Sequence, residues 1–143
     1  MNRNIKVAVA QMNSHVGSID YNLRKIIKFI NLGKNKKVDL LCFPELALVG
    51  YPPEDLLLSK NFLKMVELAV KKIQKKDKNI SYIVGYPKLI DGKLYNVAGV
   101  FIHGELKYEY KKIRLPNYGV FDEQRYFESG IEPLMFKLKN RSI

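Results

Sequence analysis

Two segments with the apolar spacing of amphipathic helices alternate with three short apolar runs, and this order limits the possible folds more than any other feature of the chain. The apolar runs, at residues 5–11, 40–43 and 80–86, are typical of strands. Asp20 and Ser59 stand where helix N-caps are expected. The residues that recur on one helix face are Leu23, Ile26, Ile27 and Ile30 after Asp20, and Phe62, Val66, Ala69, Val70 and Ile73 after Ser59. The order β-α-β-α-β predicts an α/β protein.

The chain after the third apolar run predicts antiparallel strands. Pro87 is expected to end the third strand. Asp91-Gly92 is the strongest turn signal in the sequence and predicts a hairpin, and Gly104 predicts a second turn. The strands expected around these turns and near the C-terminus are residues 88–90, 93–101, 106–111 and 134–138. Residues 140–143 are expected to turn toward a further strand that these 143 residues do not include.

The composition sets the broad class of the protein. The chain has 143 residues, about the length of one domain, with 47% hydrophobic and 27% charged residues, as in ordinary globular proteins. No apolar run approaches the ~18 residues that span a membrane, and Lys6 interrupts the apolar core that a signal peptide would need. The single cysteine, Cys42, excludes an intrachain disulfide. These features predict a cytoplasmic protein with no membrane partner.

The net charge of +11 raises the question of nucleic-acid binding. Many of the lysines follow the two helical segments, where cations complement the negative end of the helix dipole. Arginines are few, and neither a glycine-aromatic RNA-binding signature nor zinc-finger spacing occurs. His15 and His103 have no partners spaced as in a metal site or a catalytic triad. We therefore expect a solvated basic surface, no metal and no nucleic-acid partner.

A loop motif follows the second apolar run. The run ends at Phe43-Pro44-Glu45-Leu46, and Gly50-Tyr51-Pro52-Pro53 continues as a loop. Glu45 thus stands at the mouth of a buried strand, where a carboxylate can serve as a base. For an isolated glutamate, a strand cap or a partner for loop amides would be the simpler interpretation.

A second motif places a lysine before another loop rich in proline and glycine. Lys112-Ile113-Arg114-Leu115-Pro116 leads into Asn117-Tyr118-Gly119 and then Phe121-Asp122-Glu123. Lys111 is a rival for the same role. Because adjacent side chains of a strand point to opposite faces, only one of these two lysines can enter a site.

Together the two motifs resemble the nitrilase (carbon–nitrogen hydrolase) superfamily, above all the glutamine-hydrolysing domain of glutamine-dependent NAD synthetases. The shared patterns are Phe-Pro-Glu-Leu with Gly-Tyr, at residues 43–46 and 50–51, and Lys-x-x-Leu-Pro, at residues 112–116. The resemblance extends from Ile5 to the end of the chain. It implies the N-terminal portion of a four-layer αββα sandwich. Residues 1–143 would then be part of one domain, truncated before the strand that carries the nucleophile and without a synthetase domain.

The resemblance also implies roles for individual residues. Glu45 would be the catalytic base, and Lys112, which has the family's distance to Leu-Pro, would stabilise the oxyanion. Glu123 would position Lys112 and the substrate amide, although a surface carboxylate paired with Arg125 or a lysine is nearly as good an interpretation. Tyr51, Tyr118 and Phe121 would wall the glutamine pocket, and Tyr118 would contact the substrate directly.

Cofactors and partners follow from the same resemblance. The chain contains neither a Gly-rich phosphate loop nor the Ser-Gly-Gly-x-Asp-Ser type of motif that an ATP-using synthetase needs. We expect no cofactor for this domain, with ATP and Mg²⁺ required only by the synthetase domain. The expected partners are glutamine, the C-terminal half of the sandwich and the synthetase domain, in a homo-oligomer when complete.

The family's cysteine nucleophile opens a Cys-Glu-Asp segment that this sequence lacks. Cys42 is expected to be a small buried hydrophobe instead. We therefore expect no glutaminase activity from the chain alone, and poor solubility or obligate association through uncovered strand edges. Three alternatives remain: another nitrilase-type amidase, a non-catalytic remnant of a split or decayed gene, and a basic binding module.

Overall fold

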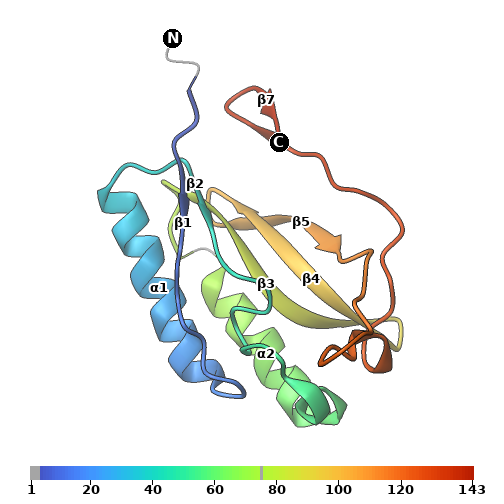
Figure 1. Cartoon of the computed structure of the whole chain (residues 1–143). Helices are drawn as coiled ribbons and strands as arrows, with labels where there is room; N and C mark the ends of the chain where they lie inside the picture. The colour runs from blue at the N-terminus through green and yellow to red at the C-terminus, as the bar shows by residue number, and fades with distance from the viewer. Residues whose placement is uncertain (1–3, 75) are drawn as a thin grey trace.

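The structure is a computed structural model that describes residues 4–74 and 76–143. Its centre is a five-stranded sheet with the strands in chain order (Figure 1). The strands are β1 (Val7–Val9), β2 (Leu40–Cys42), β3 (Ser81–Ile90), β4 (Lys93–Ile102) and β5 (Glu105–Lys111). β1, β2 and β3 pair in parallel, whereas β3, β4 and β5 pair antiparallel. The predicted α/β class is therefore confirmed.

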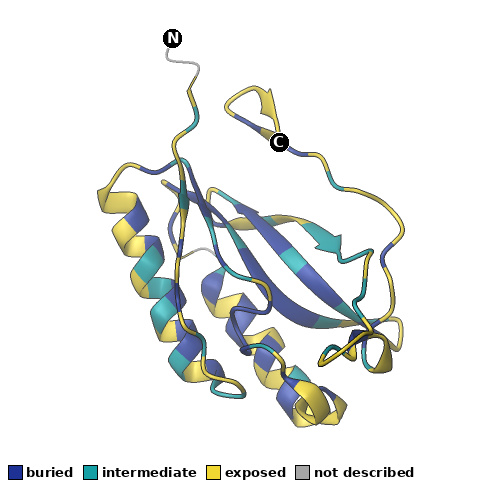
Figure 2. Ribbon diagram, viewed as in Figure 1, coloured by how far each residue is buried: buried dark blue, intermediate teal, exposed yellow. Residues whose placement is uncertain are grey.

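Two helices, α1 (Ile19–Asn35) and α2 (Lys60–Ile73), cover one face of the sheet (Figure 1). Buried and exposed residues recur along each of them, so that one stripe of each helix faces the strands (Figure 2). The short 3₁₀ helix η1 (Glu54–Leu58) precedes α2. None of the helices in the described part of the chain has the length and apolar character that a membrane crossing requires.

The two helices begin differently. The Ser59 hydroxyl accepts a hydrogen bond of 3.2 Å from the Phe62 N–H and caps α2, as predicted. The N-cap of α1 is Ser18, so the prediction that Asp20 caps this helix is wrong. Asp20 lies in the first turn, where its carboxylate can still interact with the positive end of the helix dipole.

β3 continues through Pro87, so the prediction that this proline ends the strand is also wrong. Pro87 lies opposite Asn96 of β4. The Asn96 carbonyl turns to the other side of β4 and accepts a 2.9 Å hydrogen bond from the Lys112 N–H. The Pro87–Asn96 pair is thus a position at which the two strands exchange no hydrogen bonds, and a residue without an N–H is tolerated there.

Apolar side chains pack on both faces of the sheet. The larger cluster lies between the sheet and the two helices, and a smaller one lies on the opposite face. Leu41 belongs to the larger cluster and its neighbour Leu40 to the smaller one, as strand alternation requires. The buried members of the smaller cluster are Leu40, Val100, Phe136 and Leu138.

The C-terminal segment lies on the side of the sheet away from α1 (Figure 1). It contains the 3₁₀ helix η2 (Glu123–Arg125) and a small hairpin of β6 (Lys137–Leu138) and β7 (Arg141–Ser142). The strand predicted over residues 134–138 is thus reduced to its last two residues. Its apolar residues Phe136 and Leu138 instead pack into the smaller cluster.

The N-cap of α2 has a side-chain hydrogen bond and the N-cap of α1 has none, so mutating the two cap residues measures the energy of this bond. Ser59→Ala removes the only side-chain acceptor at its cap and should lower the free energy of unfolding by about 1 kcal/mol. Ser18→Ala is the matched control, because the Ser18 side chain makes no cap hydrogen bond. Urea unfolding followed by circular dichroism measures both variants. Equal losses in the two would contradict the assigned caps.

Candidate active site

Glu45 lies in the turn after β2, and this turn crosses directly over β3. The Phe43 N–H donates to the Ile83 carbonyl at 2.9 Å, and the Leu48 N–H donates to the Gly85 carbonyl at 3.2 Å. A Cβ atom on Gly85 would lie 2.4 Å from the Leu46 nitrogen. Only glycine therefore allows the turn to approach β3 so closely, and this approach carries Glu45 to the edge of β4.

Two side chains donate hydrogen bonds to the same oxygen of Glu45. The Asn96 Nδ2 donates to Glu45 Oε1 at 2.6 Å, and the Lys112 Nζ donates to the same atom at 2.7 Å. Asn96 is buried, whereas the Glu45 side chain is 43% exposed. Within the described part of the chain, the hydrogen bonds to this carboxylate fall on Oε1.

The Lys112 ammonium also contacts a second carboxylate, Glu123 Oε1, at 2.9 Å. Burial disfavours its charge, but the hydrogen bonds and charges of Glu45 and Glu123 outweigh this effect and raise the pKa of Lys112 above the ordinary lysine value. The neighbouring Lys111 places its ammonium over the Tyr95 ring at 4.6 Å instead. Of the two rival lysines, the structure therefore brings only Lys112 to Glu45.

Glu123 is 5% exposed and belongs to η2. Its Oε1 accepts a second hydrogen bond from the Tyr51 hydroxyl at 2.8 Å. Burial and the Glu123 carboxylate both raise the pKa of the Tyr51 hydroxyl, which therefore stays protonated. Among the described residues, none donates to the buried Oε2 of Glu123. The interpretation of Glu123 as a surface carboxylate is wrong, because Glu123 is buried. Its cation is Lys112 rather than Arg125, whose Nη2 lies 3.5 Å from Asp55 Oδ1.

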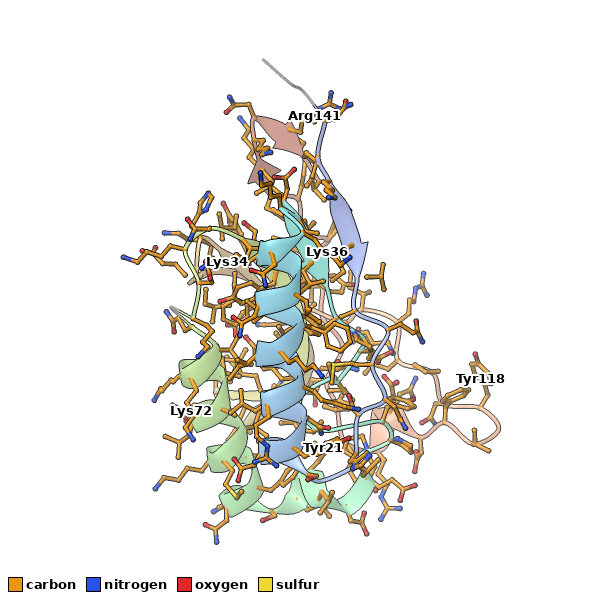
Figure 3. All side chains as sticks on the ribbon, turned by 90° about the vertical axis from the view of Figure 1, so that its left-hand side faces the viewer. Tyr21, Lys34, Lys36, Lys72, Tyr118 and Arg141 are labelled. Atoms are coloured by element: carbon orange, nitrogen blue, oxygen red, sulfur yellow. The ribbon has the colours of Figure 1, made fainter. Side chains whose placement is uncertain are left out.

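Three aromatic side chains lie beside these charges. The rings of Tyr51 and Phe121 are 6.3 Å apart, and those of Phe121 and Tyr118 are 5.6 Å apart. Tyr118 is 71% exposed and stands on a loop that projects from the body of the protein (Figure 3). The structure thus groups all three aromatic residues singled out from the sequence, with Tyr51 innermost and Tyr118 outermost.

Two hollows flank the charged residues. One, of about 400 Å³, is lined by Glu45, Lys112 and Asn96 together with apolar residues of β3 and β4. The other, of about 280 Å³, is lined by Tyr51, Phe121 and Glu123 among others. Lys112 lines the first hollow and Glu123 lines the second, so their ion pair lies between the two hollows. Polar groups therefore converge where apolar walls meet.

Cys42 lies apart from these contacts. It ends β2, is partly rather than fully buried, and packs against the smaller apolar cluster. Burial raises the pKa of its thiol, which is the opposite of what a reactive cysteine needs. His15 stacks on Tyr21, and His103 occupies a turn with a positive φ angle. In the described residues no group of histidine, cysteine and carboxylate side chains could hold a metal ion.

Asn96 was not predicted as a site residue. The sequence contained one signal for it, since a polar amide stands in the apolar strand segment between Leu94 and Phe101. Buried polar side chains in such a segment need a hydrogen-bond partner. That partner, Glu45, lies on a different element and could not be identified from the spacing alone.

Comparisons with known proteins find relatives over nearly the whole chain. Residues 6–139 match the family Carbon-nitrogen hydrolase. The chain is 40% identical to a glutamine-dependent NAD(+) synthetase of Xylella fastidiosa over 97% of its own length and 26% of that protein. It is 41% identical to the protein of the same name from Thermotoga maritima, over 96% of this chain and 24% of that protein. The chain thus spans about a quarter of these curated relatives.

Solved structures show the same relationship. A glutamine-dependent NAD+ synthetase from Acinetobacter baumannii, in complex with adenosine diphosphate, superposes with a TM-score of 0.92 and 40% identity over 96% of this chain and 26% of that one. An amidase from Nesterenkonia sp. superposes with a TM-score of 0.84 at 22% identity, over 96% of this chain and 53% of that one. The second likeness shows the shared fold alone.

The contacts of Lys112 predict that replacing it lowers the stability of the folded protein by an amount that depends on pH. Lys112→Gln leaves the buried Glu123 without its cation and should lower the free energy of unfolding by about 1–3 kcal/mol at pH 7. Because folding raises the pKa of Lys112, its contribution is complete below about pH 10.4 and is lost as the pH rises through the higher folded-state pKa. The difference between wild type and variant should therefore shrink only above pH 10.

Lys111→Gln is the matched control, since it removes the same charge one residue away. It should cost about 1 kcal/mol or less, since it removes a cation–π contact between two partly exposed residues. Denaturant unfolding between pH 7 and pH 11 measures both variants. A larger loss for Lys111→Gln than for Lys112→Gln would contradict the assignment of the central cation.

Proposed function

The chain belongs to the carbon-nitrogen hydrolase family, and from this premise we propose that it forms the N-terminal part of the glutamine-hydrolysing domain of a glutamine-dependent NAD synthetase. The observation that carries the proposal is the single ammonium of Lys112 shared between the carboxylates of Glu45 and Glu123. The aromatic group of Tyr51, Phe121 and Tyr118 beside it supports glutamine as the substrate. The names of the relatives favour the same substrate.

In this proposal the three charged residues divide the work of amide hydrolysis. Glu45 Oε2 takes the proton of a cysteine thiol, which then attacks the side-chain amide carbon of glutamine. The carbonyl oxygen gains negative charge in the tetrahedral intermediate, and the protonated Lys112 stabilises it. Glu123 holds Lys112 through Oε1 and positions the substrate amide through this lysine. The intermediate collapses as Glu45 returns the proton to the amide nitrogen, and ammonia leaves for the synthetase domain. The thioester that remains on the cysteine is hydrolysed by water to glutamate.

Cys42 does not supply the thiol in this scheme. It is the only cysteine of the sequence, it packs with apolar side chains, and burial raises the pKa of its thiol. We propose that the nucleophile comes from a segment outside residues 1–143. The chain provides the base, the cation and part of the substrate pocket.

The remaining expectations belong to the same proposal. This domain needs no cofactor, whereas ATP and Mg²⁺ serve the synthetase domain. Its partners are glutamine, the second half of the sandwich and the synthetase domain, within a cytoplasmic homo-oligomer and without nucleic acid. Another amidase activity remains the alternative, since it would need Glu45 and Lys112 but not the aromatic group.

Residues 1–143 alone should release no ammonia from glutamine, because a base and a cation cannot replace the nucleophile of a covalent mechanism. A coupled glutamate dehydrogenase assay on the purified chain measures this. Turnover that disappears in Cys42→Ala would contradict both the inactivity and the structural role given to Cys42.

A chimera tests the function itself. Residues 1–143 replace the matching quarter of the Xylella fastidiosa synthetase, and NAD formation is measured with glutamine and, separately, with ammonium chloride. We expect both activities from the chimera. Glu45→Gln should lower the glutamine-dependent rate at least ~10²-fold, because the thiol loses its base, and should leave the ammonium-dependent rate intact.

The ammonium reaction reports whether the chimera is folded. If that reaction proceeds and glutamine is not used, the proposed function is wrong. If simple aliphatic amides are hydrolysed faster than glutamine, the alternative amidase activity is favoured instead.

A further inference from the structure

We propose that Asn96 is a positioning residue that holds Glu45 in register with Lys112. The inference rests on the function proposed above, since it assigns Asn96 to the machinery of the same site. Asn96 contacts the proposed base Glu45 directly, and it lies on β4, between β3 and β5.

Asn96 contacts both catalytic candidates through different groups. Its side-chain Nδ2 donates to Glu45 Oε1 at 2.6 Å. Its backbone carbonyl accepts the Lys112 N–H at 2.9 Å. One residue thus connects the side chain of the base to the backbone of the cation, although Glu45 and Lys112 are 67 positions apart in the sequence.

The position of Asn96 makes it more rigid than the group it holds. It is 4% exposed and lies on β4, a central strand hydrogen-bonded on both sides. Glu45 is 43% exposed and lies on a turn. A site is more accurately placed by residues on sheet strands than by residues on loops, so the strand sets the position of the turn residue.

The chemistry of an amide suits this role. Lys112 alone would hold Glu45 by an ion pair on a long and flexible side chain, which fixes orientation poorly. A second cation in place of Asn96 would compete with the proton that the base must accept. The neutral Nδ2–H restrains Oε1 without adding charge, and Oε2 is left to receive the proton.

Asn96→Asp tests this role in the chimera, because it keeps the size of the side chain and removes the donor. A carboxylate placed 2.6 Å from Glu45 Oε1 repels it, and the glutamine-dependent rate should fall by about 10- to 100-fold at pH 7.5. The ammonium-dependent rate should be unchanged. Lowering the pH protonates the introduced carboxyl group, which can then donate to Glu45, so the loss relative to wild type should become smaller.

Asn61→Asp is the control for charge, since it makes the same change at an exposed position of α2. It should alter neither activity. In a Glu45→Gln background, Asn96→Asp should cause no further loss, because a positioning residue acts through the group that it holds. An equal fall in both activities, or an unchanged glutamine-dependent rate, would overturn the proposal.

A spectroscopic measurement on the chimera, labelled with ¹⁵N-asparagine, separates this inference from the proposed function. A side-chain amide proton that donates to a carboxylate at 2.6 Å should give a resonance of Asn96 shifted downfield in a ¹H–¹⁵N spectrum. Glu45→Ala should remove that shift, and Lys111→Gln should not. An Asn96 resonance that is the same in wild type and Glu45→Ala would overturn the positioning role even if the chimera uses glutamine.

Discussion

The ion pairs of Lys112 are the interaction on which the arrangement of this protein's charged residues depends. Glu123 is 5% exposed, and a carboxylate buried to that degree needs a cation and a hydrogen-bond donor nearby. Lys112 supplies the cation and Tyr51 the donor, so η2, the loop after β2 and the end of β5 are held together at one point. Glu45 contacts the same ammonium but stays half-exposed, which leaves it the more accessible of the two carboxylates.

Backbone hydrogen bonds to two different segments fix the position of Lys112. Its N–H donates to the Asn96 carbonyl, and its carbonyl accepts the N–H of Gly130, each at 2.9 Å. A Cβ atom at Gly130 would lie 2.1 Å from the Lys111 carbonyl oxygen, so a glycine is required for this close approach. A shift of β5 by one residue would direct Lys111 toward Glu45 and Lys112 toward Tyr95. The backbone register thereby selects the lysine that meets the two carboxylates.

Features that depend on neighbouring residues could be predicted from the sequence. The helices, the Ser59 cap and the turn at Asp91-Gly92 follow from local preferences, and Glu45 and Lys112 from motifs. Features that depend on distant partners could not. Pro87 remains inside β3 because the carbonyl opposite it turns to β5, and Asn96 meets a carboxylate from another element. The burial of Glu123 likewise depends on a loop 72 positions earlier in the chain.

On the face of the sheet opposite the helices, a row of side chains runs from the edge strand β1 to the hollow that contains Glu45. Val9, Cys42 and Ile83 pair side by side across β1, β2 and β3, and Ile83 also lines the hollow that contains Glu45. Val9 is 72% exposed at the edge strand, whereas Phe136 and Leu138 already cover the neighbouring part of this face. A protein segment that buried this row would therefore also border Glu45.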